Sequence, residues 1–187
     1  MYTCLFIASQ TGESCFDPLF FHFPTIEDTF KDIEHSFIVA NTLKISPVLE
    51  TNATTLNSYF PNGNWVSMNK MNEIVRIDDP SGGKMVNIKA PNGIYPGADS
   101  TINVHLMPGS LIIFQQNKLG DLTTFDMVKN GEITIIINRD QHKHAEGMVY
   151  LDHGESISEL TNKLYEYYKF NVNDKTLTKW ILNEDLK

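Results

Sequence analysis

The chain has 187 residues, which is the size of one ordinary domain or of one domain with a small appendage. Hydrophobic residues make up 41% of it and aromatic residues 11%, a composition that is typical of globular proteins and excludes a disordered chain. The formal net charge of −8 argues against nucleic acid or an anionic membrane as a partner, because both require clustered Lys and Arg. A neutral sugar remains compatible with this charge.

The cysteines and the apolar runs limit the class of protein further. Cys4 and Cys15 are the two cysteines of the chain, and free buried thiols are favoured over a disulfide as their interpretation. No apolar run approaches about 18 residues, so no membrane span is expected. No signal peptide is visible at the start.

The first 35 residues predict a small α/β segment. Residues 1–9 are apolar with good helix formers, and Thr11-Gly12 forms a common helix end. Residues 16–23 form a nearly continuous apolar run that ends at Pro24, which favours a strand covered on both faces. A short helix is predicted over residues 25–33, with Thr25 as its N-cap.

The rest of the chain changes to the pattern of β-strands. Short alternating or β-branched runs are separated by turn signals such as Asn62-Gly63 and Pro108-Gly109. Eight to ten such strands predict an antiparallel β-sandwich. A polar stretch over residues 117–126 marks an internal boundary.

An ordered set of segments spans nearly the whole chain: Tyr2-Thr3, residues 8–20, 46–49, 59–65, 102–106, 109–113 with Gln115, and 146–156. Taken in order, these segments resemble the C-terminal end of glycoside hydrolase family 31, the family of α-glucosidases. No single motif decides the resemblance, and the pattern is most similar to the lysosomal and intestinal branch.

The resemblance implies an architecture. Residues 1–35 would be a remnant of the last helix, strand and helix of a (β/α)₈ barrel, and residues 36–120 a proximal C-terminal β-sandwich domain. Residues 121–187 would be a partial distal β-domain. A complete barrel needs about 250 residues, so the chain cannot contain one.

The resemblance also implies that catalytic residues are absent. The two carboxylates of the family lie on barrel strands upstream of the matching region. Three positions depart from the family pattern: Asp17 stands where the family has Arg, Met107-Pro108-Gly109 replaces Arg-Gly-Gly, and His153 replaces the second Asp of an Asp-Asp-Gly turn.

Neither acidic pair in the chain is expected to replace the missing carboxylates, which retaining glycosidases hold about 5–5.5 Å apart. Asp78-Asp79 precedes a Pro-Ser-Gly-Gly turn, and acidic residues there usually cap the turn. Asp152 and Glu155 flank a second tight turn, for which a structural role is again favoured.

A metal site and a cofactor are not expected either. The histidines His142, His144 and His153 could form a metal site with Asp152, but a solvated loop is the favoured interpretation. No cofactor is predicted, because the chain has no phosphate-binding loop, dinucleotide fingerprint or nucleophile elbow.

Two weaker candidates concern sugars. Tyr59, Phe60 and Trp65 could form a sugar-stacking platform, although aromatic residues at such strand positions more often belong to a core. Asn52-Ala53-Thr54 is a glycosylation sequon at Asn52, usable only in the secretory pathway. The family suggests a secretory or lysosomal location.

The run over residues 16–23 predicts a protein interface. On a strand, Leu19, Phe20, Phe21 and Phe23 would lie on both faces, and the small α/β segment cannot cover them all. We therefore expect a separate protein or a second copy of the chain to cover these residues.

Three functions stay open. The first is a non-catalytic C-terminal module that acts as a structural or interaction protein within a larger assembly; Met1 favours independent translation and so this function. The second is the C-terminal chain of a split or processed α-glucosidase, whose carboxylates lie on another chain. The third is a carbohydrate-binding β-sandwich.

Overall fold

The structure is a computed structural model that describes residues 1–31, 33–51, 53–89, 102–116, 132–152, 162 and 164–182. The chain forms two compact units. Residues 14–108 form one, here called the central unit, and residues 1–13 with 109–187 form the other, here called the terminal unit. Each is described by itself.

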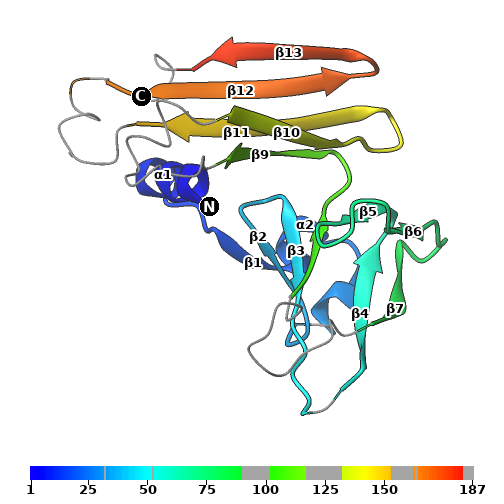
Figure 1. Cartoon of the computed structure of the whole chain (residues 1–187). Helices are drawn as coiled ribbons and strands as arrows, with labels where there is room; N and C mark the ends of the chain where they lie inside the picture. Colours follow the sequence, from blue (N-terminus) through cyan, green and yellow to red (C-terminus); the bar gives the residue numbers. More distant parts are fainter. Residues whose placement is uncertain are drawn as a thin grey trace. The chain divides into compact units, whose positions relative to one another are not determined.

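The central unit contains a six-stranded sheet and a two-stranded sheet (Figure 1). The strand order of the larger sheet is β1-β2-β3-β8-β5-β6, and β4 pairs with β7 in the smaller one. All of these pairs are antiparallel. The elements are β1 Phe16–Pro18, α2 Leu19–His22, the 3₁₀ helix η1 Glu27–Phe30, β2 Phe37–Val39, β3 Leu43–Ser46, β4 Thr55–Pro61, β5 Gly63–Ser67, β6 Ile74–Ile77, β7 Gly83–Lys89 and β8 Asn103–Leu106.

The strand predicted over residues 16–23 is wrong beyond Pro18. The chain leaves β1 at Pro18 and forms the single helical turn α2, closed by a hydrogen bond from the Phe23 amide to the Leu19 carbonyl at 3.0 Å. Pro18 adopts φ −64° and ψ 156°, which is extended geometry suited to the residue before a helix. The helix predicted over residues 25–33 is reduced to η1, which begins after Ile26 rather than at Thr25.

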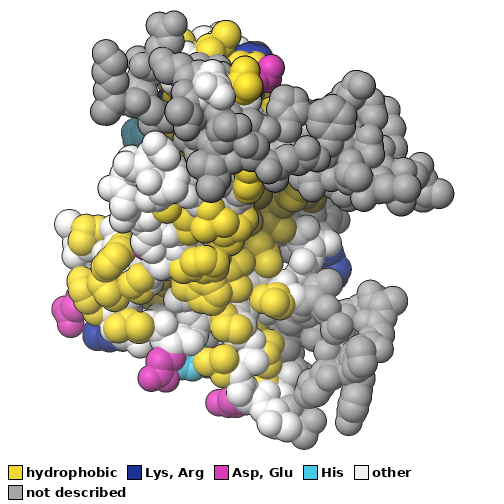
Figure 2. All heavy atoms as spheres, turned by 90° about the vertical axis from the view of Figure 1, so that its left-hand side faces the viewer, with side chains coloured by type: hydrophobic (Ala, Val, Ile, Leu, Met, Phe, Trp, Pro, Cys, Tyr) yellow, Lys and Arg dark blue, Asp and Glu magenta, His cyan; other side chains and the backbone are white. Residues whose placement is uncertain are grey.

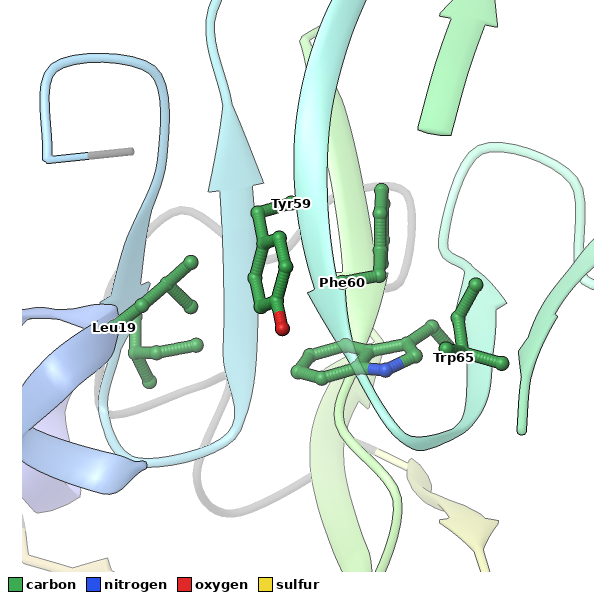
Figure 3. Packing of buried hydrophobic residues seen from close by; sticks show 6 residues of the cluster. Leu19, Tyr59, Phe60 and Trp65 are labelled. Carbon is green, nitrogen blue, oxygen red and sulfur yellow. The ribbon is translucent and has the colours of Figure 1, made fainter. Parts of the chain in front are cut away.

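A hydrophobic core holds the central unit together. Leu19, Tyr59, Phe60 and Trp65 come from α2, β4 and β5 and converge in one cluster with Ile38 and Ile77 (Figure 3). Trp65 and Phe60 are 0% exposed, and their rings meet edge to face with centroids 5.7 Å apart. The consecutive residues Tyr59 and Phe60 point to opposite faces of β4, so both faces of this strand are covered.

The terminal unit is one sheet with a helix on it (Figure 1). Its strand order is β10-β9-β11-β12-β13; the pairs are antiparallel except for one parallel bridge between β9 and β11. The elements are α1 Tyr2–Thr11, β9 Ser110–Gln116, β10 Glu132–Asn138, β11 His144–Leu151, β12 Glu166–Asn173 and β13 Thr176–Ile181.

Both faces of this sheet carry apolar clusters. On one face Phe6 of α1 stacks on Tyr150, with centroids 3.7 Å apart, and also meets Tyr165 and Tyr167. On the other face lies a cluster of aliphatic and aromatic residues: Leu111, Ala145, Val149, Phe170 and Val172. The helix predicted at the start of the chain is confirmed, and it ends at Gly12 with φ 78°.

β13 lies at the edge of the sheet. Every residue from Thr176 to Ile181 is exposed, including Leu177, Trp180 and Ile181. Within the part of the chain that the structure describes, β13 pairs with β12 alone.

The interpretation of the cysteines as free thiols is wrong. Cys4 and Cys15 are both disulfide-bonded, and the chain has no other cysteine. Cysteine spacing alone does not distinguish this arrangement from two buried thiols.

The predicted fold class, mainly antiparallel β preceded by a small α/β segment, is confirmed. The sequence-derived boundaries at residues 35 and 120 concern evolutionary domains and stay a prediction. The compact units divide the chain differently, near residues 13 and 108.

Candidate functional site

The four residues predicted to form an interface lie in different environments. Leu19 is 1% exposed and belongs to the core, and Phe23 packs against that core with its ring 6.3 Å from Trp65. Phe20 is half-buried, whereas Phe21 is 63% exposed. The helical turn α2 causes this division, because its side chains do not alternate as those of a strand would.

Phe20, Phe21 and Phe30 form an exposed group of rings, here called the aromatic surface. The Phe20 ring lies edge-on to Phe21 at 5.1 Å and stacks on Phe30 at 4.8 Å. Phe30, in η1, is 46% exposed. Hydrophobic side chains are prominent on the face drawn in the space-filling view (Figure 2). Three adjoining phenyl rings in water are unusual for a surface without a partner.

Asp17 and His22 contact each other next to this surface. Asp17 on β1 is 6% exposed, and its Oδ2 atom lies 3.4 Å from Nε2 of His22 on α2. The pair therefore links the strand to the helical turn that carries Phe20 and Phe21. The sequence marked Asp17 as a departure from the family but offered no signal for its partner.

Tyr59 and Trp65 do not present a face to a sugar. Tyr59 is 2% exposed and Trp65 is 0% exposed, and the Trp65 indole donates to the Pro61 carbonyl at 2.8 Å. Burial, and then the nearby Asp28 and Asp79 carboxylates, raise the pKa of the Tyr59 hydroxyl. These rings have the core role that aromatic residues at such positions usually have.

Asp79, the second residue of the acidic pair Asp78-Asp79, has a structural role in a turn. The Asp79 carboxylate accepts from the Ser81 amide at 2.9 Å and from the Ser81 hydroxyl at 2.7 Å. The bond from the Ser81 amide is the main reason why the pKa of Asp79 lies below its ordinary value.

Asn52, Glu155 and His153 lie outside the described residues.

Asp152 has a structural role as well. Its carboxylate accepts from the Tyr2 hydroxyl at 2.7 Å and from the Tyr150 hydroxyl at 2.8 Å, which fastens α1 to β11. His144 meets the Asn171 amide at 2.8 Å, while His142 is exposed. Across the described ranges, no group of three or more His, Cys, Asp or Glu side chains could hold a metal ion.

The central unit contains a buried polar layer that the sequence did not predict. Lys44 is 0% exposed; its ammonium donates to the Ser46 hydroxyl at 2.7 Å and to the Ser58 hydroxyl, and lies 4.1 Å from the Phe60 ring centre. His105 stands opposite Lys44 on β8 and is 5% exposed. Burial, followed by the Lys44 charge, lowers the pKa of His105 to about 4.

The central unit also contains a pocket of about 450 Å³ beside the β4–β7 pair. Its lining consists of Lys31 and His35, of residues from the connection between β3 and β4, and of residues of β4 and β7. No helix in the described part of the chain is long and apolar enough to cross a membrane.

Comparison with known proteins identifies the family. Residues 12–112 match the model described as the Glycosyl hydrolase family 31 C-terminal domain. The chain belongs to glycoside hydrolase family 31. A probable α-glucosidase of rice, Oryza sativa subsp. japonica, is 33% identical over 156 residues, which cover 83% of this chain and 16% of the rice protein. Intestinal sucrase-isomaltase of Homo sapiens is 28% identical over 97% of the chain and 9% of its own length.

Two solved structures share the fold of this chain. The α subunit of glucosidase II superimposes with a TM-score of 0.80 at 20% identity, over 96% of this chain and 18% of that one. A family 31 dextranase of Flavobacterium johnsoniae gives a TM-score of 0.71 at 24% identity, over 91% and 19%. The chain thus spans less than a fifth of the length of each of these four proteins.

Proposed function

We propose that this chain is a non-catalytic C-terminal module of family 31 that acts as a structural and interaction protein within a larger assembly. Its partner is a (β/α)₈ barrel of the same family, supplied by the remainder of a longer protein or by a separate chain, and hydrolysis of glucosides by that barrel is not part of this proposal. The family assignment, confined to the C-terminal domain, supports this proposal.

The aromatic surface is the observation that carries the proposal. Phe21 and Phe30 are 63% and 46% exposed and touch the half-buried Phe20, and burying a Phe side chain contributes about 1.5–3 kcal/mol. Because this surface lies on the segment that resembles the end of a barrel, an apolar barrel surface is the partner that suits it.

The roles of Asp79 and Asp152 support a module that does not itself catalyse glycoside hydrolysis. Glycoside hydrolysis requires one carboxylate as acid and a second as base or nucleophile, both aimed at a bound sugar. Asp79 instead caps a turn, and Asp152 binds two tyrosine hydroxyls. The alternative, the C-terminal chain of a split or processed α-glucosidase, shares the same surface and differs in that the assembly hydrolyses α-linked glucose.

Hydrogen exchange and a glucosidase assay together test the proposal. The amides of residues 16–23 are expected to exchange more slowly in material from the source than in the isolated chain. The isolated chain is expected to release no product from a chromogenic α-glucoside above buffer. Activity of the assembly towards the same glucoside would favour the split-enzyme alternative.

A matched pair of variants makes the test specific. Phe21→Ser is expected to keep the stability of the chain within about 0.5 kcal/mol and to abolish capture of the partner, because the side chain is exposed. Met71→Ser changes another exposed apolar residue of the central unit, 48% exposed, and is expected to retain the partner. Equal protection of residues 16–23 in both states would contradict the proposal.

A further inference from the structure

The pocket beside β4 and β7 combines walls from three parts of the central unit. Lys31 and His35 come from the segment after η1, and Leu49 and Glu50 from the connection between β3 and β4. Its volume of about 450 Å³ lies in the range of about 300–1,000 Å³ that is usual for small-molecule sites.

Two asparagines line the pocket. Asn57 on β4 and Asn87 on β7 face each other directly in the antiparallel register. The Asn87 Nδ2 atom donates to the Asn57 Oδ1 atom at 2.8 Å. Each carboxamide has one nitrogen and one oxygen, so this bond leaves the Asn57 nitrogen as a donor and the Asn87 oxygen as an acceptor. Exchanging the nitrogen and oxygen in both groups leaves the same pair, one donor and one acceptor.

The pocket lining also contains apolar side chains. Met85 is 48% exposed and Leu49 is 59% exposed, and both line the pocket. A ligand that fills the space would therefore meet the hydrogen-bonding groups of the two asparagines as well as a thioether and an isobutyl group. Such a division suits a molecule with both hydroxyl groups and a carbon-hydrogen face.

The charges in the pocket do not select an ion. The Lys31 ammonium lies 2.8 Å from the Asp28 carboxylate and 3.4 Å from that of Glu27, which offset its charge. Glu50 adds a negative charge to the lining. These carboxylates would repel an anion. A metal ion would lack ligands, because no group of three or more His, Cys, Asp or Glu side chains lies together among the described residues.

We propose that this pocket binds a neutral sugar, a hexose or a short oligosaccharide. Asn57 and Asn87 would hold two neighbouring hydroxyls, one accepting from the free amide nitrogen and one donating to the free amide oxygen. Met85 and Leu49 would pack on the carbon-hydrogen face of the ring. The site does not depend on the partner proposed above, and it differs from the stacking platform of Tyr59 and Trp65, which are buried.

Titration of the full chain by NMR tests the site, with glucose and maltotriose as probes. Saturable shifts are expected for the side-chain amides of Asn57 and Asn87 and for the Met85 methyl group. Asn57→Ala and Asn87→Ala are each expected to weaken binding about tenfold, the effect of one lost hydrogen bond of about 1.4 kcal/mol. Both side chains are exposed, so the variants are expected to fold, which the dispersion of their spectra checks.

The control replaces a surface asparagine elsewhere in the same unit. Asn64→Ala on β5 is expected to bind like the unaltered chain. Glucose 6-phosphate is expected to bind no more tightly than glucose, because its phosphate would meet Glu50 and the acidic neighbours of Lys31. Three results would overturn the proposal: no saturable shift up to about 50 mM sugar, shifts centred outside the pocket, or affinities unchanged in both asparagine variants.

Discussion

Lys44 and His105 stand directly opposite each other on β3 and β8, and both side chains lie in the buried polar layer of the central unit. They share Phe60 as a neighbour: the Lys44 ammonium lies 4.1 Å from the centre of its ring, and the His105 ring meets it edge-on at 5.1 Å. Two basic groups in one core make the fold sensitive to acid.

Stability is expected to fall as the pH drops below 6.5. Burial lowers the pKa of His105 from 6.5 to about 4, so the unfolded chain binds a proton in this window that the folded chain does not. The contribution of His105 is thus fully present above pH 6.5 and is lost as the pH falls towards 4. The loss at pH 4.5 is about 2–3 kcal/mol, measured as the difference in unfolding free energy between pH 7 and pH 4.5.

A neutral replacement tests the origin of this loss. His105→Gln is expected to reduce the difference in unfolding free energy between pH 7 and pH 4.5 by about 2–3 kcal/mol. His142→Gln alters an exposed histidine and is expected to leave the difference unchanged. A pH dependence that is identical in the two variants would exclude His105 as the cause.

The two tryptophans are expected to respond differently to truncation. Trp65→Ala removes a 0% exposed ring from the core and the hydrogen bond to Pro61, and is expected to cost about 3–5 kcal/mol. Trp180→Ala removes a ring that is 46% exposed and is expected to cost below about 1 kcal/mol. Urea unfolding measures both, and a cost below 1 kcal/mol at Trp65 would contradict its position in the core.

Gly147 is expected to tolerate no side chain. A Cβ atom there would lie 2.6 Å from the Leu111 Cδ1 atom and 2.7 Å from the Leu111 carbonyl oxygen, so β9 and β11 would have to move apart. Gly147→Ala is expected to destabilise the chain by about 1–3 kcal/mol in the same assay. Met148→Ala, at a 41% exposed neighbour, serves as the control, and a smaller loss at Gly147 than at Met148 would refute the close packing.

The disulfide predicts a simple thiol count. Denatured, unreduced protein is expected to react with no equivalent of maleimide, and reduced protein with two, because both cysteines are bonded. Replacing both by Ser is expected to lower stability by ~3 kcal/mol, the loop-closure effect of a short loop. Two reactive thiols before reduction would show that the bond is absent.

Sequence patterns predicted the sheets better than the functional surfaces. The alternation of Ile102 to Leu106 predicted a strand that the structure contains as β8, and the aromatic positions of Tyr59 and Trp65 predicted core residues. The prediction of a strand over residues 16–23 failed because a short apolar run is compatible with one helical turn as well as with a strand. Pro18 permits either continuation.

The polar layer and the pocket could not be predicted for a different reason. The alternation of Leu43, Lys44, Ile45 and Ser46 suggests that Lys44 and Ser46 face water, yet both are 0% exposed. Their burial depends on Ser58 and Phe60, which belong to another sheet. The pairing of Asn57 with Asn87 likewise depends on register across thirty residues, which no local pattern specifies.

The edge strand β13 has a consequence for handling the isolated chain. Among the described residues no strand pairs with its outer edge, and this edge and the exposed side chains of Leu177, Trp180 and Ile181 form a template on which another extended segment can be added. Lys179 is the single charge among these six residues, and its ammonium lies over the Tyr168 ring at 3.8 Å. The isolated chain is therefore expected to form β-rich aggregates at high concentration. A second lysine at position 177 or 181 is expected to suppress this aggregation.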